Sequence, residues 1–512
     1  MPSEDMPMKM VGRRKNQNGS QGSRSPTDSR SPPGSRSPAG SPSGSPTHAL
    51  PIQRMASTIS NRSSKATDVC VFLRDGSAHE IFIENVLTTS AGALFSLMMD
   101  CLSLPPEASD IFSLWLTSPL LQLQLKPHHI PFRLCRQWPD LLDKYTTHSE
   151  ELKANDEPVI SFQRNAFYPK DAEKKITNDE ILKKLFEEAK RNVLDGMYPC
   201  EAEDYEYLAG LITYIESGKY EESLHQLGFF KDNDLRKVLP ACMFKGGSRR
   251  SIGRGRTGAM VSIEASILQH WKHFTEKVTS KEDCYNLFLQ FCWKLPFYGC
   301  VFFRGQIERA NTHAVKVRDT SDRPVLVGIN RDGIYIIDEV KQELLLGLTF
   351  DELSWEYTEP VRSDSDCLPC LWLEFDSHER GKWCSKVLQV FSKQAVMMNA
   401  LIEACVDELN KRDIENSLRK TNHTVMGGLL SNENNCNKVG EDETDAPATS
   451  QRAAMEVTAP VIGALPTKEP KTSLCTKMDR LCLATFSDKG ELISRKKVKR
   501  SFTFHGLFNW SS

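Results

Sequence analysis

The chain has 512 residues, which is room for about three or four domains. Its formal net charge of −2 gives no indication of an oppositely charged partner, so partners must be inferred from local patches. The first residues, MPSEDMPMKM, lack the apolar core of a secretory signal, and no stretch reaches the roughly 18 apolar residues of a membrane span. The 15 cysteines are scattered, many inside apolar runs, as is typical of reduced core residues. We therefore expect a soluble intracellular protein.

The first 66 residues are rich in Ser, Pro, Gly and Arg and poor in apolar side chains. Such a composition cannot bury enough surface to offset the entropy lost on ordering, so we expect residues 1–66 to be disordered. Ten lysines and arginines against three aspartates and glutamates give this head a local charge of +7. Phosphorylation by proline-directed kinases would erase that charge, although a plain spacer is an equally good interpretation. The candidate phosphorylation sites are Ser25, Ser31, Ser37, Ser41 and Ser45.

The composition becomes globular after the head, and residues 67–167 predict a compact α+β unit. Two apolar runs flank Asp75 and Gly76, which is a strong hairpin signal. A short helix follows, with Thr89 or Ser90 as its cap, and then come strands, a second helix and a last strand. This order of elements is that of a ubiquitin-like roll.

Residues 168–296 predict a unit made only of helices. Apolar residues recur at near-helical spacing, with Asn178 or Thr177 as one cap and Gly196 as one stop. An Arg- and Gly-rich insertion at 245–258 interrupts the pattern. We therefore expect a helical lobe that carries one basic surface loop.

The period of the apolar residues changes again in residues 297–411, where we expect about seven strands and one closing helix. That content is typical of a barrel of the pleckstrin-homology or phosphotyrosine-binding type. Only Pro296 and Gly299 mark the join to the helical unit, and aromatic side chains fill it. We therefore expect the two units to share a core instead of being joined by a polar linker.

The polar residues 412–470 predict a disordered linker, and residues 471–512 form a basic and aromatic tail. Three interpretations of the tail stay open. An anionic inner leaflet could attract it, an import receptor could bind its charges, or it could dock on the folded part of the chain. The residues that would bind a membrane are Arg495, Lys496, Lys497, Lys499, Arg500, Phe502 and Trp510.

Two short motifs bear on catalysis. The stretch GRGRTG, from Gly253 to Gly258, matches GxGxxG but lies between predicted helices, so a surface loop is favoured over a dinucleotide site. The CxxC of Cys367 and Cys370 has no second pair of ligands and opens a predicted strand, so it indicates core cysteines. No catalytic signature accompanies them, and we expect no enzyme, cofactor, metal site, nucleic-acid partner or small-molecule substrate.

Three stretches resemble a known family. ISFQRNAFYPKD (160–171) is similar to the crossover between the first two lobes of the FERM family. FEEAKRNVLDGMYPCEAEDYEYLAGLITYIESGKY (186–220) resembles the core of its second lobe, and LPFYGCVFFRG resembles the start of its third. The resemblance covers about residues 66–411. It implies a ubiquitin-like roll, a helical lobe like acyl-CoA-binding protein and a pleckstrin-like barrel, with disordered termini.

The resemblance also implies a function. Details such as LTFDELSW and LWLEFD are most similar to adaptors that bind cytoplasmic regions of the inactive rhomboids (iRhoms) and hold them, with their sheddase partner, at the cell surface. The same resemblance implies antagonism of Wnt signalling through the Wnt co-receptor. We expect a cytoplasmic protein, peripheral at the inner face of the plasma membrane. The alternative is a lipid-binding linker of membrane and cytoskeleton, although no long charged helix is expected after the third lobe.

A barrel of this class binds peptides by adding a strand to an open edge beside the closing helix. The edge is predicted at residues 352–358. The helix should pack on the barrel through an apolar stripe, and apolar residues on its flank would then line a groove. The flank could instead pack on another lobe or on the chain's own tail. The predicted peptide-binding residues are Leu353, Trp355, Tyr357, Met397 and Leu401, and the predicted stripe is Ala395, Met398, Ile402, Cys405 and Leu409.

Overall fold

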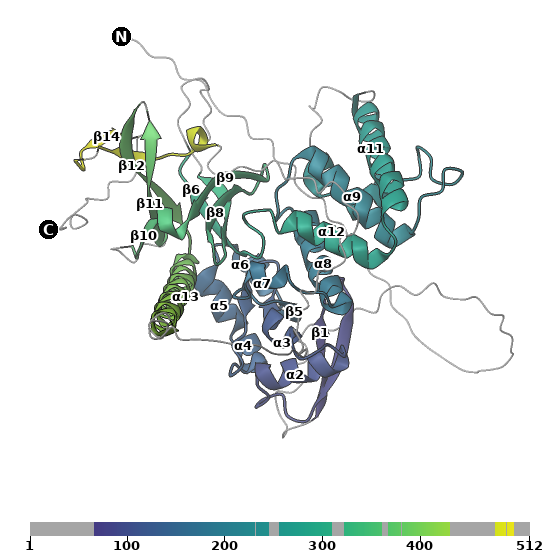
Figure 1. Cartoon of the computed structure of the whole chain (residues 1–512), viewed down its shortest axis with the longest axis horizontal. Helices are drawn as coiled ribbons and strands as arrows, with labels where there is room; N and C mark the ends of the chain where they lie inside the picture. The colour runs from purple at the N-terminus through teal and green to yellow at the C-terminus, as the bar shows by residue number, and fades with distance from the viewer. Residues whose placement is uncertain are drawn as a thin grey trace, which may run out of the picture. The chain divides into compact units, whose positions relative to one another are not determined.

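The computed structural model shows three lobes that follow one another along the chain (Figure 1). It describes residues 66–230, 232–244, 255–309, 322–360, 367–379, 381–430, 477–487 and 489–495. The five Ser-Pro serines of the head and the tail beyond residue 495 lie outside these ranges. None of the described helices is long and apolar enough to cross a lipid bilayer.

The first lobe is built on a five-stranded sheet with the order β2-β1-β5-β3-β4, in which β1 and β5 run parallel. The first hairpin turns at Gly76, whose φ of +89° is a conformation that favours glycine. Ser90 caps the first helix through the amide of Ala93, as one of the two predicted caps. The strands are β1 (Thr67–Phe72), β2 (Ala78–Ile83), β3 (Phe112–Thr117), β4 (Gln122–Gln124) and β5 (Val159–Arg164). The helices are α2 (Ala91–Cys101), α3 (Ala108–Ile111), α4 (Pro131–Arg136), α5 (Trp138–Tyr145) and α6 (Glu150–Ala154).

The second lobe is helical. Asn178 caps α8 through the amides of Glu180 and Ile181, and Gly196 follows the helix with a φ of +75°. The last helix but one begins at Gly255, so part of the predicted insertion is helix, and residues 245–254 lie outside the described residues. The helices are α7 (Lys170–Glu173), α8 (Asp179–Leu194), α9 (Ala202–Ser217), α10 (Asp232–Val238), the 3-10 helix η1 (Ala241–Phe244), α11 (Gly255–Lys277) and α12 (Lys281–Cys292).

The third lobe is a barrel with the strand order β10-β11-β12-β6-β7-β8-β9, closed by a helix. All seven strands expected from the sequence are present, and with the first two lobes they confirm the α+β class. The strands are β6 (Val301–Ile307), β7 (Arg323–Ile329), β8 (Gly333–Asp338), β9 (Glu343–Thr349), β10 (Ser354–Thr358), β11 (Cys370–Glu379) and β12 (Lys382–Phe391). A 3-10 helix, η2 (Phe350–Glu352), precedes β10.

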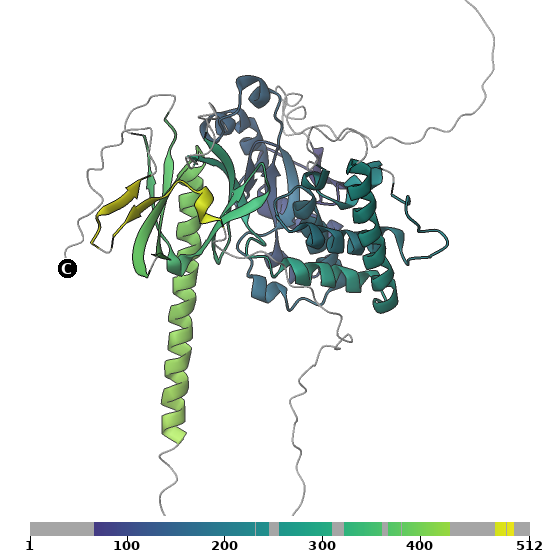
Figure 2. The ribbon, with the colours of Figure 1, turned by 90° about the horizontal axis from the view of Figure 1, so that it is seen from above.

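The closing helix α13 (Ala395–Leu430) differs from the prediction in its length. It was expected to end near residue 411, and the linker from 412 was expected to be disordered, but the helix continues to Leu430. Figure 2 shows its second half leaving the barrel as a straight rod. The predicted stripe is correct: Ala395, Met398, Ile402 and Cys405 are buried and Leu409 is partly buried.

The core explains why no linker separates the lobes. One continuous apolar cluster runs through the first and second lobes and includes Leu326, Tyr335, Ile337 and Leu344 of the third. A second cluster fills the barrel itself. Phe297, in the aromatic join, packs edge-on against Tyr335. The expectation of a shared core is therefore confirmed.

A buried ion pair lies where the three lobes meet. Arg164, at the end of β5, donates through Nε to Glu173 at 2.6 Å, and Glu173 is fully buried. The same carboxylate accepts from Trp293 Nε1 at 2.7 Å and from the hydroxyl of Tyr298. Burial alone would lower the pKa of the Arg164 guanidinium, but the charge of Glu173 raises it above its ordinary value. The guanidinium therefore stays charged, and the hydrogen bonds around Glu173 join all three lobes.

Gly299 makes room for this pair. Its φ is +71°, and a Cβ at this position would stand 2.8 Å from Nη1 of Arg164. Its amide donates to the hydroxyl of Tyr198 in the second lobe at 3.0 Å. The glycine in the aromatic join is thus required by both conformation and space.

We predict that Glu173→Gln lowers the free energy of unfolding by about 3 kcal/mol, because it leaves the Arg164 charge buried without its counter-ion. Asp171→Asn is the matched control from the same short helix. Asp171 forms an ion pair with Lys174, but its side chain is 86% exposed, so this change should cost less than about 0.5 kcal/mol. Chemical denaturation followed by tryptophan fluorescence measures both. Equal losses in the two variants would contradict the role given to the buried pair.

Candidate peptide-binding site

The barrel sheet has two edge strands, and they differ in what covers them. β9 contacts η3 (Met478–Arg480), a 3-10 helix of the chain's tail. β10 pairs only with β11 among the described strands, in the register Ser354–Glu374 to Thr358–Cys370. Unpaired backbone groups on an edge strand are a template for a further strand. The edge predicted from the sequence is therefore open in the part of the chain that the structure describes.

Three of the five predicted peptide-binding residues lie on or beside this edge. Leu353 is 7% exposed and belongs to the barrel core, so it supports the strand and offers little surface to a partner. Trp355 and Tyr357 are partly buried against the same core. Trp355 donates from Nε1 to Oδ1 of Asn399 at 3.1 Å, which joins β10 to α13.

The other two predicted residues, Met397 and Leu401, lie on the helix α13. At about 100° per residue, Met397 and Leu401 are each about 160° around α13 from Asn399. Both are partly buried against the barrel core itself. Glu408 follows on the same side and pairs with Arg331 in the loop between β7 and β8 at 2.9 Å. The structure therefore does not bring Met397 and Leu401 together with Trp355.

The flank that does lie beside β10 was missed. Val396 and Glu403 are within about 60° of Asn399 around the helix. Val396 is 37% exposed, and Glu403 accepts from Nδ2 of Asn399 at 2.8 Å. A polar residue next to an apolar stripe looks like ordinary solvated surface in a sequence. Only the contact with Trp355 shows which side of the helix faces the edge.

Part of the tail docks on the barrel. β13 (Ala484–Phe486) pairs antiparallel with residues Ser385 to Val387 of β12, and β14 (Leu492–Arg495) continues the sheet beyond it. Leu481 and Leu483 are buried in the barrel core. Of the three interpretations of the tail, docking therefore applies to residues 477–495. Of the residues proposed to bind a membrane, only Arg495 lies within the described part.

Charge also fixes the docked tail. Glu343 of β9 pairs with Lys477 at 3.1 Å and with Arg480. Burial alone would raise the pKa of Glu343, but the hydrogen bond and charge of Lys477, with the charge of Arg480, lower it. A lowered carboxyl pKa contributes stability above that pKa. We therefore expect the docking of the tail to weaken as the pH falls through the pKa of Glu343.

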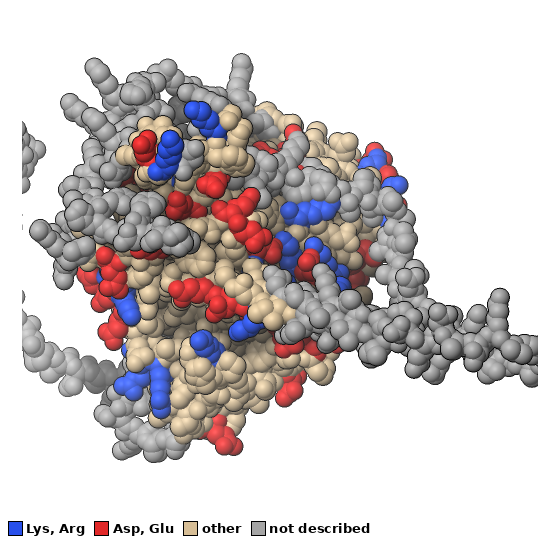
Figure 3. Space-filling view, turned by 60° about the vertical axis from the view of Figure 1, so that its left-hand side comes forward, with Lys and Arg blue, Asp and Glu red and all other residues tan. Residues whose placement is uncertain are grey.

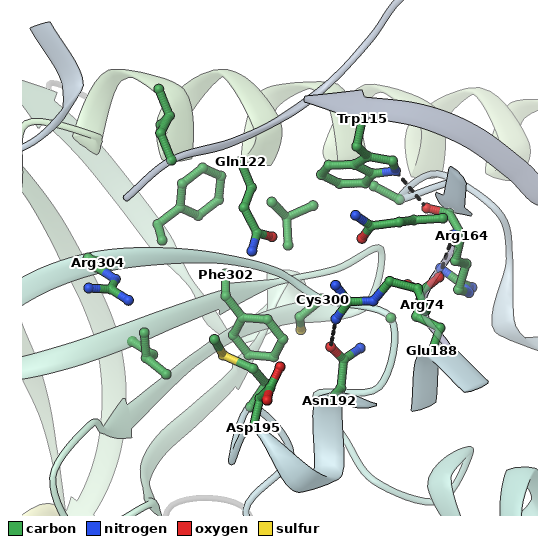
Figure 4. Close-up of a pocket in the computed structure, with 18 of the residues that line it drawn as sticks. Arg74, Trp115, Gln122, Arg164, Glu188, Asn192, Asp195, Cys300, Phe302 and Arg304 are labelled. Atoms are coloured by element: carbon green, nitrogen blue, oxygen red, sulfur yellow. Dashed lines mark hydrogen bonds between the residues drawn. The ribbon is translucent and has the colours of Figure 1, made fainter. Parts of the chain in front are cut away.

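A separate hollow of about 110 Å³ lies at the junction of the lobes (Figure 4). Arg74 donates to Asn192 at 3.2 Å, and the backbone amide of Arg164 donates to Glu188 at 2.6 Å. Burial raises the pKa of Glu188 above its ordinary value. Trp115 donates to the carbonyl of Arg164 at 3.1 Å. Because the bonds of Arg74 to Asn192 and of Arg164 to Glu188 hold the first lobe to the second, the hollow is part of the junction.

The CxxC motif of Cys367 and Cys370 has the surroundings of core cysteines. Cys370 is buried at the start of β11, and burial raises the pKa of its thiol to about 12. Its CxxC partner, Cys367, is partly buried and free. Among the described residues no group of three His, Cys, Asp or Glu side chains is placed to hold a metal ion. Gly253 lies outside the described residues.

A ubiquitin-like roll, a helical lobe and a pleckstrin-like barrel, in this order and on one junction, define a FERM domain. The family model for the FERM central domain matches residues 171–303, and that for the KRIT1/FRMD8 FERM domain C-lobe matches residues 323–401.

Comparison with individual proteins is more specific. FERM domain-containing protein 8 of Homo sapiens is 38% identical over 359 residues, which cover 69% of this chain and 76% of that protein. The protein of the same name from Mus musculus is 33% identical over 461 residues, which cover 88% of this chain and 91% of that protein. The chain therefore belongs to the FERM domain-containing protein 8 family. One similar solved structure is that of the human Myosin 7b C-terminal MyTH4-FERM domain in complex with harmonin-a PDZ3 domain. It is 17% identical, has a TM-score of 0.45, and the match covers 67% of this chain and 60% of that chain.

We predict that Leu481→Asp releases the docked tail, because it places a charge where a fully buried leucine (1% exposed) now packs. Lost burial alone should cost about 2 kcal/mol. Ile493→Asp is the matched control, since Ile493 is 63% exposed in β14. Hydrogen exchange should become faster in residues 477–495 and in Ser385 to Val387 of Leu481→Asp only. Unchanged protection of these amides in Leu481→Asp would show that the pairing does not depend on this anchor.

Proposed function

We propose that this protein is a non-enzymatic FERM adaptor that holds the cytoplasmic segment of a membrane protein as an added strand on β10. One observation carries the proposal: among the described strands β10 has an open edge beside α13, whereas the tail contacts β9 at the other edge of the sheet. An added strand gains main-chain hydrogen bonds from the edge and specificity from the side chains that flank it. A rigid junction of the three lobes presents that edge in one orientation.

The proposed partners are the cytoplasmic regions of iRhoms and of the Wnt co-receptor. Membership of the FERM domain-containing protein 8 family supports this choice, together with the resemblance of the stretches around β10 and β11. By holding iRhoms and their sheddase partner at the cell surface, the adaptor would support ectodomain shedding. Through the co-receptor it would restrain Wnt signalling. These partners place its action at the cytoplasmic face of the plasma membrane.

The proposed contact surface differs from the one expected from the sequence. Trp355 and Tyr357 would lie under the added strand, and Val396, Asn399 and Glu403 would form the wall on α13. Buried aromatic side chains carry much of the energy of such interfaces, so Trp355 is the proposed anchor. Met397 and Leu401 would support the helix from its other side.

The alternative function, a lipid-binding linker of membrane and cytoskeleton, draws on the basic residues Arg495, Lys496, Lys497, Lys499 and Arg500. Four of these lie beyond the described residues. The open edge of β10 has no role in that function. Binding of a receptor segment by purified protein without lipid therefore distinguishes the adaptor from the linker.

We predict that Val396→Glu weakens binding of an iRhom cytoplasmic segment at least about tenfold, because it puts a charge beside the apolar contacts of the added strand. Met397→Glu/Leu401→Glu carries the same kind of change on the opposite side of α13 and should bind within about twofold of wild type when folded. Isothermal titration calorimetry measures the affinities. Thermal melts identify any variant that is unfolded.

The opposite pattern, with a loss only in Met397→Glu/Leu401→Glu, would move the binding site to the other flank of the helix. Wild-type affinity in both folded variants would remove this groove from the proposal. No binding by wild-type protein without anionic lipid would favour the linker.

A further inference from the structure

A large hollow of about 810 Å³ opens on the third lobe, next to the docked tail. Residues of η2, β10, β11 and the start of β12 line it, and Met478 and Phe486 of the tail complete it. The docked tail therefore borders this hollow at Met478 and Phe486, before it turns back into β14.

The lining of the hollow has one sign of charge. The described residues that line it include five carboxylates and no lysine, arginine or histidine. The carboxylates are Asp351, Glu352, Glu356, Glu374 and Asp376. Figure 3 shows acidic side chains on this side of the molecule, with lysine and arginine side chains between them. The acidic lining of the hollow attracts a basic segment.

Aromatic side chains lie among these carboxylates. Trp355, Trp372, Trp383 and Phe486 all line the hollow. Trp383 is 66% exposed, which is unusual for so large an apolar side chain. The faces of tryptophan rings bind lysine and arginine, and their edges pack with other aromatic rings. The hollow therefore suits a ligand that is both basic and aromatic.

The register of the sheet leads from the tail to the hollow. Arg495 lies opposite Ala484, Ala484 opposite Val387, and Val387 opposite Glu374. Residues directly opposite each other in antiparallel strands share one face of a sheet. Arg495 is therefore in the same row as Glu374, about 14 Å away over three strand spacings.

The residues that follow have the complementary chemistry. From Arg495 to Ser512 the sequence RKKVKRSFTFHGLFNWSS contains five lysines and arginines and no aspartate or glutamate. Its basic residues precede its aromatic ones, Phe502, Phe504, Phe508 and Trp510. Seven residues in extended form reach about 23 Å, so the segment from Arg495 to Phe502 is long enough to cross the hollow.

We propose that residues 496–510 dock in this hollow, with the basic residues on its carboxylates and the aromatic residues on its tryptophans. The occupant is the chain's own tail because docking of residues 477–495 already holds its start three strand spacings, about 14 Å, from Glu374. The proposal does not depend on the partner of β10. It assigns to the basic cluster a protein surface instead of a membrane.

The test uses the full chain with the photo-crosslinking residue p-benzoylphenylalanine in place of Phe502. Irradiation should give intramolecular crosslinks to residues 351–387, located by mass spectrometry. The same residue in place of Leu224, which is 65% exposed on the second lobe, should give no crosslink to this region.

The charge of the hollow is tested by Asp351→Asn/Glu356→Gln/Asp376→Asn, which neutralises three exposed carboxylates. Each exposed charge pair is worth a factor of about two to three, so the equilibrium constant of docking should fall about tenfold and the crosslink yield at least about twofold. The matched control neutralises three exposed carboxylates of the first lobe and should leave the yield unchanged. It is Asp68→Asn/Asp100→Asn/Glu80→Gln.

A vesicle assay tests the competing interpretation, in which the basic cluster binds an anionic membrane. Vesicles of phosphatidylserine and phosphatidylcholine should sediment the triple variant of the hollow more than wild type, because the variant releases the tail. Equal sedimentation of the two would show that the basic cluster is already free for lipid, and would overturn the proposal. Crosslinks that lie outside residues 351–387, or that persist at full yield in the triple variant, would also overturn it.

Discussion

The arrangement of this FERM domain depends on the buried pair of Arg164 and Glu173. Two charges removed from water are stable only when nearly every donor and acceptor finds a partner. Here those partners come from all three lobes: the carbonyls of Asn165 and Tyr168 accept from Arg164 at 3.1 and 2.6 Å, and Trp293 and Tyr298 donate to Glu173. A movement of the first lobe against the second would separate the two charges, and a movement of the third lobe would break the hydrogen bond of Tyr298 to Glu173. The junction therefore allows one arrangement of the lobes, and it does so without linkers.

A fixed arrangement decides which surface of the third lobe can bind. The junction occupies the side of the barrel near β7 and β8, where Arg331 donates to the carbonyl of Phe167 and Lys170 pairs with Asp332 at 3.0 Å. The tail covers β9 and adds two strands beside β12. Among the residues that the structure describes, the edge of β10 and the Asn399 side of α13 stay uncovered. The candidate site is thus defined largely by the surfaces that the rest of the chain has already used.

The sequence predicted what depends on local pattern and missed what depends on long-range pairing. Alternating apolar residues placed the strands of the barrel, and helical spacing placed the stripe from Ala395 to Cys405. Arg164 and Glu173 gave no signal, because charged residues are by default solvated and nothing local shows that these two meet. The position of Met397 and Leu401 on the far side of α13 became visible only through the bond between Trp355 and Asn399. The docking of the tail was one of three open interpretations, since burial of Leu481 depends on a partner more than a hundred residues away.

The docked part of the tail changes the energetics of everything attached to it. Leu481 and Leu483 anchor residues 477–495 in the barrel core. The basic segment therefore starts about 14 Å from Glu374 in the acidic hollow. A short tether gives an effective concentration of about millimolar or more. Exposed charge pairs, each worth at most about 1 kcal/mol, would bind a free peptide too weakly to matter, but under this tether a few of them suffice. Because Trp355 lines both the hollow and the groove beside α13, a receptor strand on β10 and the tail would meet at the same tryptophan. Occupation of the edge would then depend on the strength of the tail's charges, and the phosphate or salt that weakens those charges would favour the receptor.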